Sequence, residues 1–130
     1  MTIEYNVSPD GSRIDTFPQG VLDIKDTINY FDKIKDDKRI KQGSIEIVYF
    51  ELVTDFKISY VESKKITQSY QEPKTTQMIA ATIFVCETNL AYGIGRMLQT
   101  FHEITNPQHK VVVIRSKNEI ENAVKNLASH

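Results

Sequence analysis

Three short apolar runs, separated by two segments of helical periodicity, constrain the fold of this chain more than any other feature. The runs cover residues 45–53, 78–86 and 110–114. Apolar runs with few polar interruptions are typical of strands covered on both faces, and helical crossovers between them imply parallel pairing. The sequence therefore predicts an α/β domain with a mostly parallel sheet flanked by helices.

The first part of the chain has a different pattern. Apolar and polar residues alternate over 3–7, and a Pro-Asp-Gly turn at 9–11 separates them from a second short strand at 13–17. Proline presets one turn dihedral and glycine tolerates a positive φ, so this segment predicts an antiparallel hairpin at the edge of the sheet. We expect Pro18 and Gly20 to end the hairpin.

Four positions have the chemistry of a helix start. Asp23, Ser59, Thr88 and Ser116 can each cap a helix, and both serines are followed three residues later by glutamate, which forms a capping box. The apolar residues predicted on the inner faces are Ile24, Ile28, Phe31 and Ile34; Val61, Ile66 and Tyr70; Leu90, Ile94, Met97, Leu98 and Phe101; and Ile120, Ala123, Val124 and Leu127. The predicted order is ββαβαβαβα, and with no linker in the chain we expect a single domain over 1–130.

Composition excludes several classes of protein. The 130 residues are 40% hydrophobic and 25% charged with a net charge of −1, so the chain has neither a disordered composition nor the basic surface of a nucleic-acid-binding protein. Lysines do gather in 33–41, but aspartates are interleaved with them, which is typical of a solvated helix end.

No segment predicts a membrane span or an export signal. The apolar run 78–86 is too short to cross a bilayer, and residues 1–10 lack a basic leader followed by an apolar stretch. A single cysteine, Cys86, excludes a disulfide within the chain. We therefore expect a cytoplasmic protein.

Three segments resemble a known family. They are 48–56 (VYFELVTDF), 90–97 (LAYGIGRM) and 111–119 (VVVIRSKNE). Together with the order of elements over about 13–128, they resemble the SpoIIAA-like fold shared by STAS domains and a group of uncharacterised bacterial proteins. The tryptophan usual near the last helix of that group is absent, and Val124 and Lys125 fill the stretch. The resemblance implies a SpoIIAA-like fold and a bacterial regulatory protein.

The resemblance also singles out Ser59. In the anti-sigma-factor antagonists with this fold, a serine at the start of the helix after the second buried strand is phosphorylated by a partner kinase, and Ser59 lies at the corresponding place. A helix N-terminus favours a phosphate. However, the Asp-Ser-Ser-Gly stretch of those proteins is replaced by 55–59 (DFKIS), and Glu62 would repel an added phosphate. A plain cap paired with Glu62 is the favoured explanation of Ser59. Thr54 is a second, weaker candidate.

The helix predicted after Thr88 contains two glycines, Gly93 and Gly95, followed by Arg96. This is not a dinucleotide-binding fingerprint, because the third glycine is missing and the segment lies within a helix. Glycine inside a helix costs about 1 kcal/mol relative to alanine, which indicates close packing against the sheet or the approach of a ligand. Thr88 and Asn89 lie where α/β sheets bind ligands, and Arg96 could hold a carboxylate or a phosphate.

Catalytic chemistry is poorly represented. Cys86 has no base near it in sequence, and His102 and His109 lie a helix length away, so the thiol is best interpreted as a small buried hydrophobe. One cysteine and three histidines have no metal-ligand spacing. We therefore predict no enzymatic activity, no metal and no cofactor.

The sequence thus favours a regulatory module that binds a protein partner. The predicted interaction surface is the loop and helix start around Ser59, with Asp55, Phe56, Lys57 and Glu62. The alternative is a carrier of a small apolar or lipid-like ligand, held between the sheet and the helix 88–104. The N-terminal hairpin has an exposed edge and would allow a homodimer without fixing its symmetry.

Overall fold

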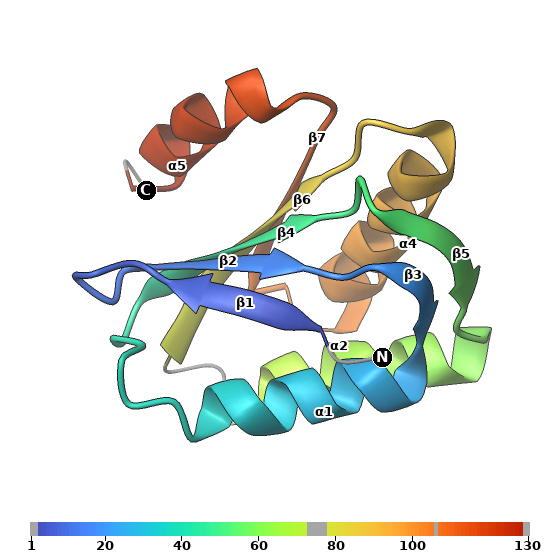
Figure 1. Ribbon diagram of the computed structural model, residues 1–130, viewed down its shortest axis with the longest axis horizontal. Coiled ribbons are helices and arrows are strands. Elements are labelled where there is room, and N and C mark those ends of the chain that lie inside the picture. Colours follow the sequence, from blue (N-terminus) through green and yellow to red (C-terminus); the bar gives the residue numbers. More distant parts are fainter. Residues whose placement is uncertain (1–2, 73–77, 106, 129–130) are drawn as a thin grey trace.

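The computed structural model describes residues 3–72, 78–105 and 107–128, which form a twisted sheet with helices on both faces (Figure 1). The strands in these ranges are β1 (Glu4–Val7), β2 (Arg13–Phe17), β3 (Gly20–Asp23), β4 (Ser44–Tyr49), β5 (Val53–Lys57), β6 (Ile79–Val85) and β7 (Lys110–Ile114). The helices are α1 (Ile24–Lys35), α2 (Tyr60–Gln71), α4 (Asn89–Thr105) and α5 (Ile120–Ala128), with a short 3₁₀ helix, η1 (Lys117–Glu119), before the last. No helix in the described ranges is long and apolar enough to cross a membrane.

The main sheet has five strands in the order β1-β2-β4-β6-β7. β1 pairs with β2 in an antiparallel manner, and the other neighbours pair in parallel. This arrangement confirms the predicted hairpin at the edge of a mostly parallel sheet. In the centre, Ile47 and Val48 of β4 lie opposite Ile83 and Phe84 of β6.

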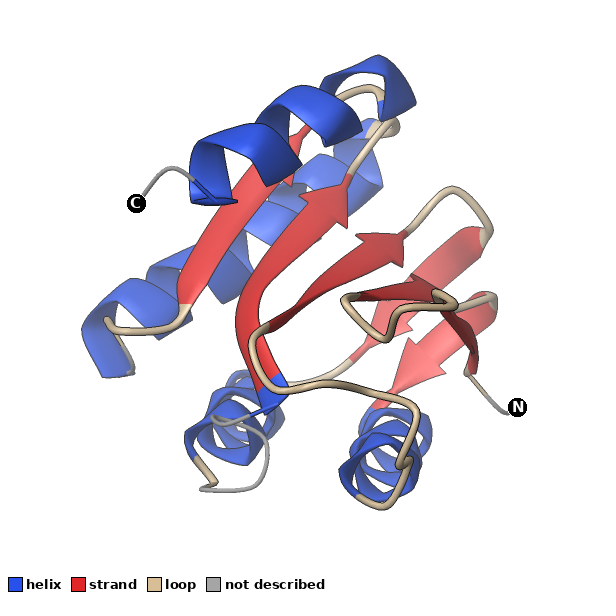
Figure 2. Cartoon of the chain, turned by 90° about the vertical axis from the view of Figure 1, so that its left-hand side faces the viewer, coloured by secondary structure: helices blue, strands red, loops and turns tan. Residues whose placement is uncertain are grey.

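The two faces of the sheet are covered unequally. Successive side chains of a strand point to opposite faces, so Val48 and Phe84 pack with α1, α2 and α4, whereas Ile47 and Ile83 pack with α5 alone. Figure 1 shows α5 above the sheet and α1 and α2 below it, and Figure 2 shows these two lower helices nearly end-on. The larger part of the core therefore lies on the face covered by three helices.

The predicted helix starts are confirmed. Asp23 accepts a hydrogen bond from the Asp26 N–H at 2.9 Å, and Thr88 accepts one from the Ala91 N–H at 3.1 Å. Both capping boxes are complete, Ser59 with Glu62 and Ser116 with Glu119. These side chains satisfy backbone donors that the first turn of a helix leaves free.

The prediction of one strand over 45–53 is wrong. β4 ends at Tyr49, and a tight turn follows in which the Val53 N–H donates to the Phe50 carbonyl at 3.0 Å. The chain then forms β5, which pairs in parallel with β3 in a separate two-stranded sheet. Gly20, expected only to end the hairpin, begins β3 with a positive φ of 66°. The turn from Phe50 to Val53 contains no glycine or proline, so no sequence signal indicates that the apolar run is divided there.

Two residues predicted on inner faces lie outside. Val61 is 64% exposed, because it lies about 140° around α2 from the buried Ile66. Leu90 is 46% exposed in the first turn of α4, where Ala91 is buried instead. Both residues therefore add to the apolar surface rather than to the core.

Candidate functional site

The segment that joins β5 to α2 is a surface with mixed chemistry, which we call the β5–α2 surface. It consists of Thr54, Asp55, Phe56, Lys57, Ser59, Tyr60, Val61 and Glu62. The part over 54–57 was expected to be a loop and is a strand, in which Thr54, Asp55 and Lys57 are exposed and Phe56 is half-buried. In Figure 1, β5 (dark green) runs toward the start of α2 at one end of the molecule.

Ser59 lies at the centre of this surface and is exposed. Its Oγ accepts a hydrogen bond from the Glu62 N–H at 3.1 Å, and its own N–H donates to Glu62 Oε1 at 3.0 Å. Its carbonyl accepts from the Ser63 hydroxyl at 3.0 Å. The serine hydroxyl is therefore accessible while it caps the helix, and a carboxylate lies beside it.

Two large apolar side chains follow Ser59 without being covered. Tyr60 and Val61 are each 64% exposed. The Tyr60 ring contacts the ring of Phe101 edge-on, with centroids 5.2 Å apart, and the Lys64 ammonium lies 5.0 Å from the Tyr60 centroid. These contacts hold the tyrosine in place and leave most of its surface in solvent, an arrangement typical of protein-binding surfaces.

The ligand-binding candidates of α4 do not form one site. Asn89 Oδ1 accepts a hydrogen bond from the Arg115 guanidinium at 3.2 Å, at the start of the helix. Arg96 is exposed two turns further on and donates to Gln99 Oε1 at 3.1 Å. Phe101, which contacts Tyr60, lies toward the other end of the helix from Thr88, so the Ser59 region and the start of α4 are separate surfaces.

The two glycines of α4 have different surroundings. A Cβ on Gly95 would lie 2.8 Å from Cys86 Sγ and 3.4 Å from Val113, so this glycine allows the helix to pack closely on the sheet, as one interpretation of the sequence predicted. A Cβ on Gly93 would meet no atom within 4 Å. Burial raises the pKa of the Cys86 thiol to about 12, which gives no support for a nucleophile.

A buried polar cluster around Glu46 was not predicted from the sequence. Glu46 is fully buried in β4, and its carboxylate accepts hydrogen bonds from Tyr30, from Tyr70 at 2.6 Å and from Thr82 at 2.9 Å. His109 Nε2 lies 2.8 Å from the Thr82 hydroxyl. The only sequence signal was an acidic residue inside an apolar strand, because the other members of the cluster come from α1, α2, β6 and the residue before β7.

Burial determines the protonation of this cluster. Loss of solvent raises the pKa of Glu46 and, helped by the charge of Glu46, the pKa values of Tyr30 and Tyr70. It lowers the pKa of His102 to about 3, with a contribution from His109, and that of His109 to about 4. Both histidines are therefore neutral near pH 7.

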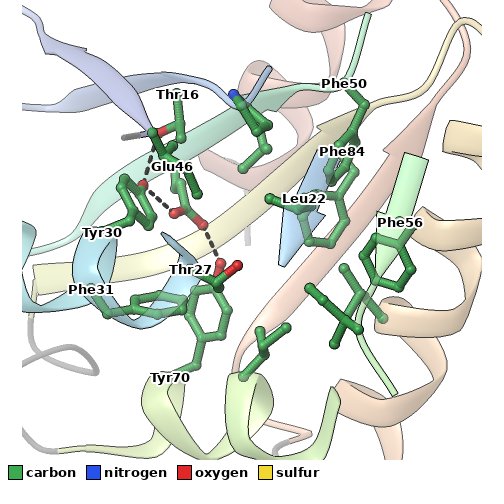
Figure 3. A pocket seen from close by; sticks show the side chains of 16 residues that line it. Thr16, Leu22, Thr27, Tyr30, Phe31, Glu46, Phe50, Phe56, Tyr70 and Phe84 are labelled. Carbon is green, nitrogen blue, oxygen red and sulfur yellow. Dashed lines mark hydrogen bonds between the residues drawn. The ribbon is translucent and has the colours of Figure 1, made fainter. Parts of the chain in front are cut away.

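A small cavity lies beside Glu46 on the face covered by three helices (Figure 3). Its volume is about 50 Å³, and its walls include the rings of Tyr30, Tyr70, Phe50 and Phe84. Pockets that enclose a drug-sized ligand measure roughly 300–1,000 Å³. Arg96, considered above as a residue that could hold a carboxylate or a phosphate, does not line this cavity.

Comparisons with known proteins relate the chain to others through its fold. No protein-family model and no curated protein match its sequence. A solved structure of an uncharacterised protein of the DUF3478 family from Shewanella loihica PV-4, described as having a SpoIIAA-like fold, matches with a TM-score of 0.60 and 9% identity, over 94% of this chain and 91% of that chain. The anti-sigma factor antagonist SpoIIAA in its unphosphorylated form matches with a TM-score of 0.55 and 10% identity, over 99% of this chain and 100% of that chain. The chain therefore has a SpoIIAA-like fold, as its sequence pattern predicted.

Proposed function

We propose that this protein is a non-enzymatic regulatory module of the cytoplasm that binds a protein partner through the β5–α2 surface, and that phosphorylation of Ser59 controls the binding. One observation carries the proposal: an exposed serine hydroxyl at the start of a helix lies next to two exposed apolar side chains, Tyr60 and Val61. The likeness to an anti-sigma factor antagonist in its unphosphorylated form is consistent with this role.

The composition of the surface supports a protein partner. Exposed aromatic residues, when covered by a partner, contribute a large share of binding energy at interfaces. Asp55, Lys57 and Glu62 add charges of both signs to the same surface. A polar rim of this kind provides specificity and orientation.

Phosphorylation would act through local electrostatics. A phosphate on Ser59 would approach the free N–H groups of α2, which favour an anion, but it would also approach the Glu62 carboxylate, which now hydrogen-bonds to Ser59. The capping box would have to open, which changes the start of α2 and the positions of Tyr60 and Val61. Thr54 on β5 is a second acceptor on the same surface.

The test is recovery of the partner from the host with a tagged protein. Wild type is compared with a Tyr60→Ser/Val61→Ser variant and with a matched Lys117→Ser/Asn118→Ser control, which alters the two positions after the other capping serine. We expect the first variant to lose at least tenfold in recovered partner and the control to retain it. Equal recovery with all three proteins would exclude the β5–α2 surface.

The cavity beside Glu46 favours a second candidate, a carrier of a small apolar ligand. Its aromatic walls suit such a ligand, but about 50 Å³ accommodates only a molecule far smaller than a lipid. Native mass spectrometry of protein from the host tests this function, because a carrier would show a non-covalent companion that is lost on denaturation. The interaction module remains the better supported function.

A further inference from the structure

The outer edge of β7 is an unused strand edge, distant from the β5–α2 surface. β7 is the last strand of the main sheet, and among the described strands it pairs only with β6. Its sequence is KVVVI, and all three valines are half-buried. After the exposed Lys110 the strand is uncharged and apolar, and an edge of this kind presents backbone groups on which another strand can pair.

The backbone groups of Val111 and Val113 point away from the sheet. The Ile114 carbonyl accepts a hydrogen bond from the Cys86 N–H at 2.8 Å, so the backbone groups of Ile114 point toward β6. Backbone groups of successive residues point in opposite directions, so those of Val111 and Val113 point away from β6. In agreement, the Val111 carbonyl accepts from Nε2 of Gln99, a side chain of α4, at 3.0 Å. Gln99 protects this one carbonyl, and the N–H and carbonyl of Val113 remain directed outward.

Grooves lie on both sides of the β7 edge. The groove on the α5 side has a volume of about 370 Å³ and is lined by Val112 and Ala123, among others. The groove on the α4 side, about 360 Å³, is lined by Val111 and His102, and Leu127 borders both grooves. Successive side chains of an added strand point to opposite faces, so they would enter the two grooves in turn.

His102 provides an independent sign that something binds in the groove on the α4 side. It is 1% exposed, and neither ring nitrogen has a hydrogen-bond partner among the described residues. Because the ring is neutral, it offers one donor and one acceptor. Leaving such a buried group without a partner is unfavourable, and a hydroxyl or amide side chain in the groove would satisfy it.

We propose that the β7 edge binds an extended segment of a partner protein as an additional strand, with apolar side chains in the groove on the α5 side and a hydroxyl or amide side chain against His102. A single strand suits the site because α4 and α5 form walls on both sides of the edge. A second copy of this chain would bring its own pair of helices against these walls.

The test uses seven-residue peptides from a random phage-displayed library, selected on the purified full-length chain and then measured by calorimetry. Val113→Pro removes the outward N–H without removing a hydrogen bond to β6, a position where an edge strand tolerates proline. We expect Val113→Pro to weaken the selected peptides at least tenfold, and Val113→Thr and Ser59→Ala to leave their affinity within twofold of wild type. Asn126→Trp, which fills the groove on the α5 side, is expected to weaken peptide binding as well. This variant tests the same site if Val113→Pro does not fold.

Three results would overturn this proposal. Selected peptides could bind no more tightly than their scrambled sequences, or their affinity could be unchanged in both Val113→Pro and Asn126→Trp. Alternatively, the protein could be a dimer in sedimentation that Val113→Pro dissociates, which would assign the edge to a second copy. Because Ser59→Ala is included, failure here is distinguishable from failure of the β5–α2 surface.

Discussion

Helix α2 and the 3₁₀ helix η1, which leads into α5, begin with the same serine–glutamate capping box, but the two boxes lie in different surroundings. In α2, Ser59 and Glu62 exchange hydrogen bonds of 3.1 and 3.0 Å. Before α5, the Glu119 carboxylate accepts from the Ser116 N–H at 3.1 Å and also from the Arg115 N–H at 3.0 Å. The equal spacing of serine and glutamate therefore gives a capped helix start twice, an α-helix after Ser59 and a 3₁₀ helix after Ser116.

The surroundings differ on both sides of each helix. Ser59 is followed by exposed Tyr60 and Val61, whereas Ser116 is followed by a lysine and an asparagine. On the inner side, α2 places Tyr70 against two histidines, whereas α5 packs on an apolar cluster. The comparison shows that a capping box determines where a helix begins, while its neighbours determine what the helix can do.

The first prediction uses pH, because two neutral buried histidines lie against the inner side of α2. His102 and His109 have pKa values of about 3 and about 4, below the ordinary 6.5, so the unfolded chain binds more protons between about pH 6.5 and 4. The free energy of unfolding therefore decreases by on the order of 2 kcal/mol as the pH falls through this window. The raised pKa of Glu46 acts in the opposite direction.

Urea unfolding of wild type and His102→Phe at pH 7 and pH 4.5 checks this prediction. The variant is expected to lose less stability on acidification, because it has one fewer group that must be buried neutral. If both proteins lose the same amount, the histidines do not cause the pH dependence.

The second prediction concerns charge at the two boxes. Aspartate is a good capping residue, so both Ser59→Asp and Ser116→Asp are expected to fold. Only Ser59→Asp adds a charge to the β5–α2 surface, and we expect it to reduce recovery of the partner about tenfold or more. The same reduction with Ser116→Asp would remove the distinction between the two helix starts.

The third prediction concerns stability, in which the boxes are expected to be alike. Ser59→Ala and Ser116→Ala each remove a side chain that caps a helix, and each should reduce the free energy of unfolding by about 1 kcal/mol. Denaturant unfolding measures both values. A negligible loss for Ser59→Ala alone would mean that its cap contributes nothing in solution.

The smallest effect is expected from the glutamates of the two boxes. Glutamine keeps the hydrogen bond but removes the charge from the helix start, so Glu62→Gln should cost about 0.3–0.5 kcal/mol. Glu119→Gln should cost slightly more, because Glu119 accepts two backbone hydrogen bonds rather than one. Thermal unfolding of the two variants side by side gives the order, and the reverse order would contradict the geometry described here.

The fold was predictable as far as it depends on local pattern. Apolar runs located β6 and β7, and side-chain caps located the starts of α1, α2 and α4. The β3–β5 pair was not predicted, because it depends on contacts between segments far apart in sequence and on a turn whose central residues are Glu51 and Leu52 rather than glycine. Turns without their usual residues leave no sequence signal.

The site was predictable only in part, for the same reason. The cap of Ser59 follows from two residues three apart, but the exposure of Tyr60 and Val61 depends on how α2 is turned against the sheet. The hydrogen-bond partners of Glu46 come from three other elements, α1, α2 and β6, so the sequence showed only an acidic residue in an apolar run. The β7 grooves likewise require two helices to be placed on opposite faces of one strand.

The most direct test of the distinction between the two helix starts is the intact mass of the protein purified from its host, followed by peptide mapping. We expect a fraction of the protein to carry one phosphate, located at Ser59 and absent in Ser59→Ala, with Ser116 unmodified. A protein without phosphate under all growth conditions, or with phosphate at Ser116 instead, would contradict the proposed switch.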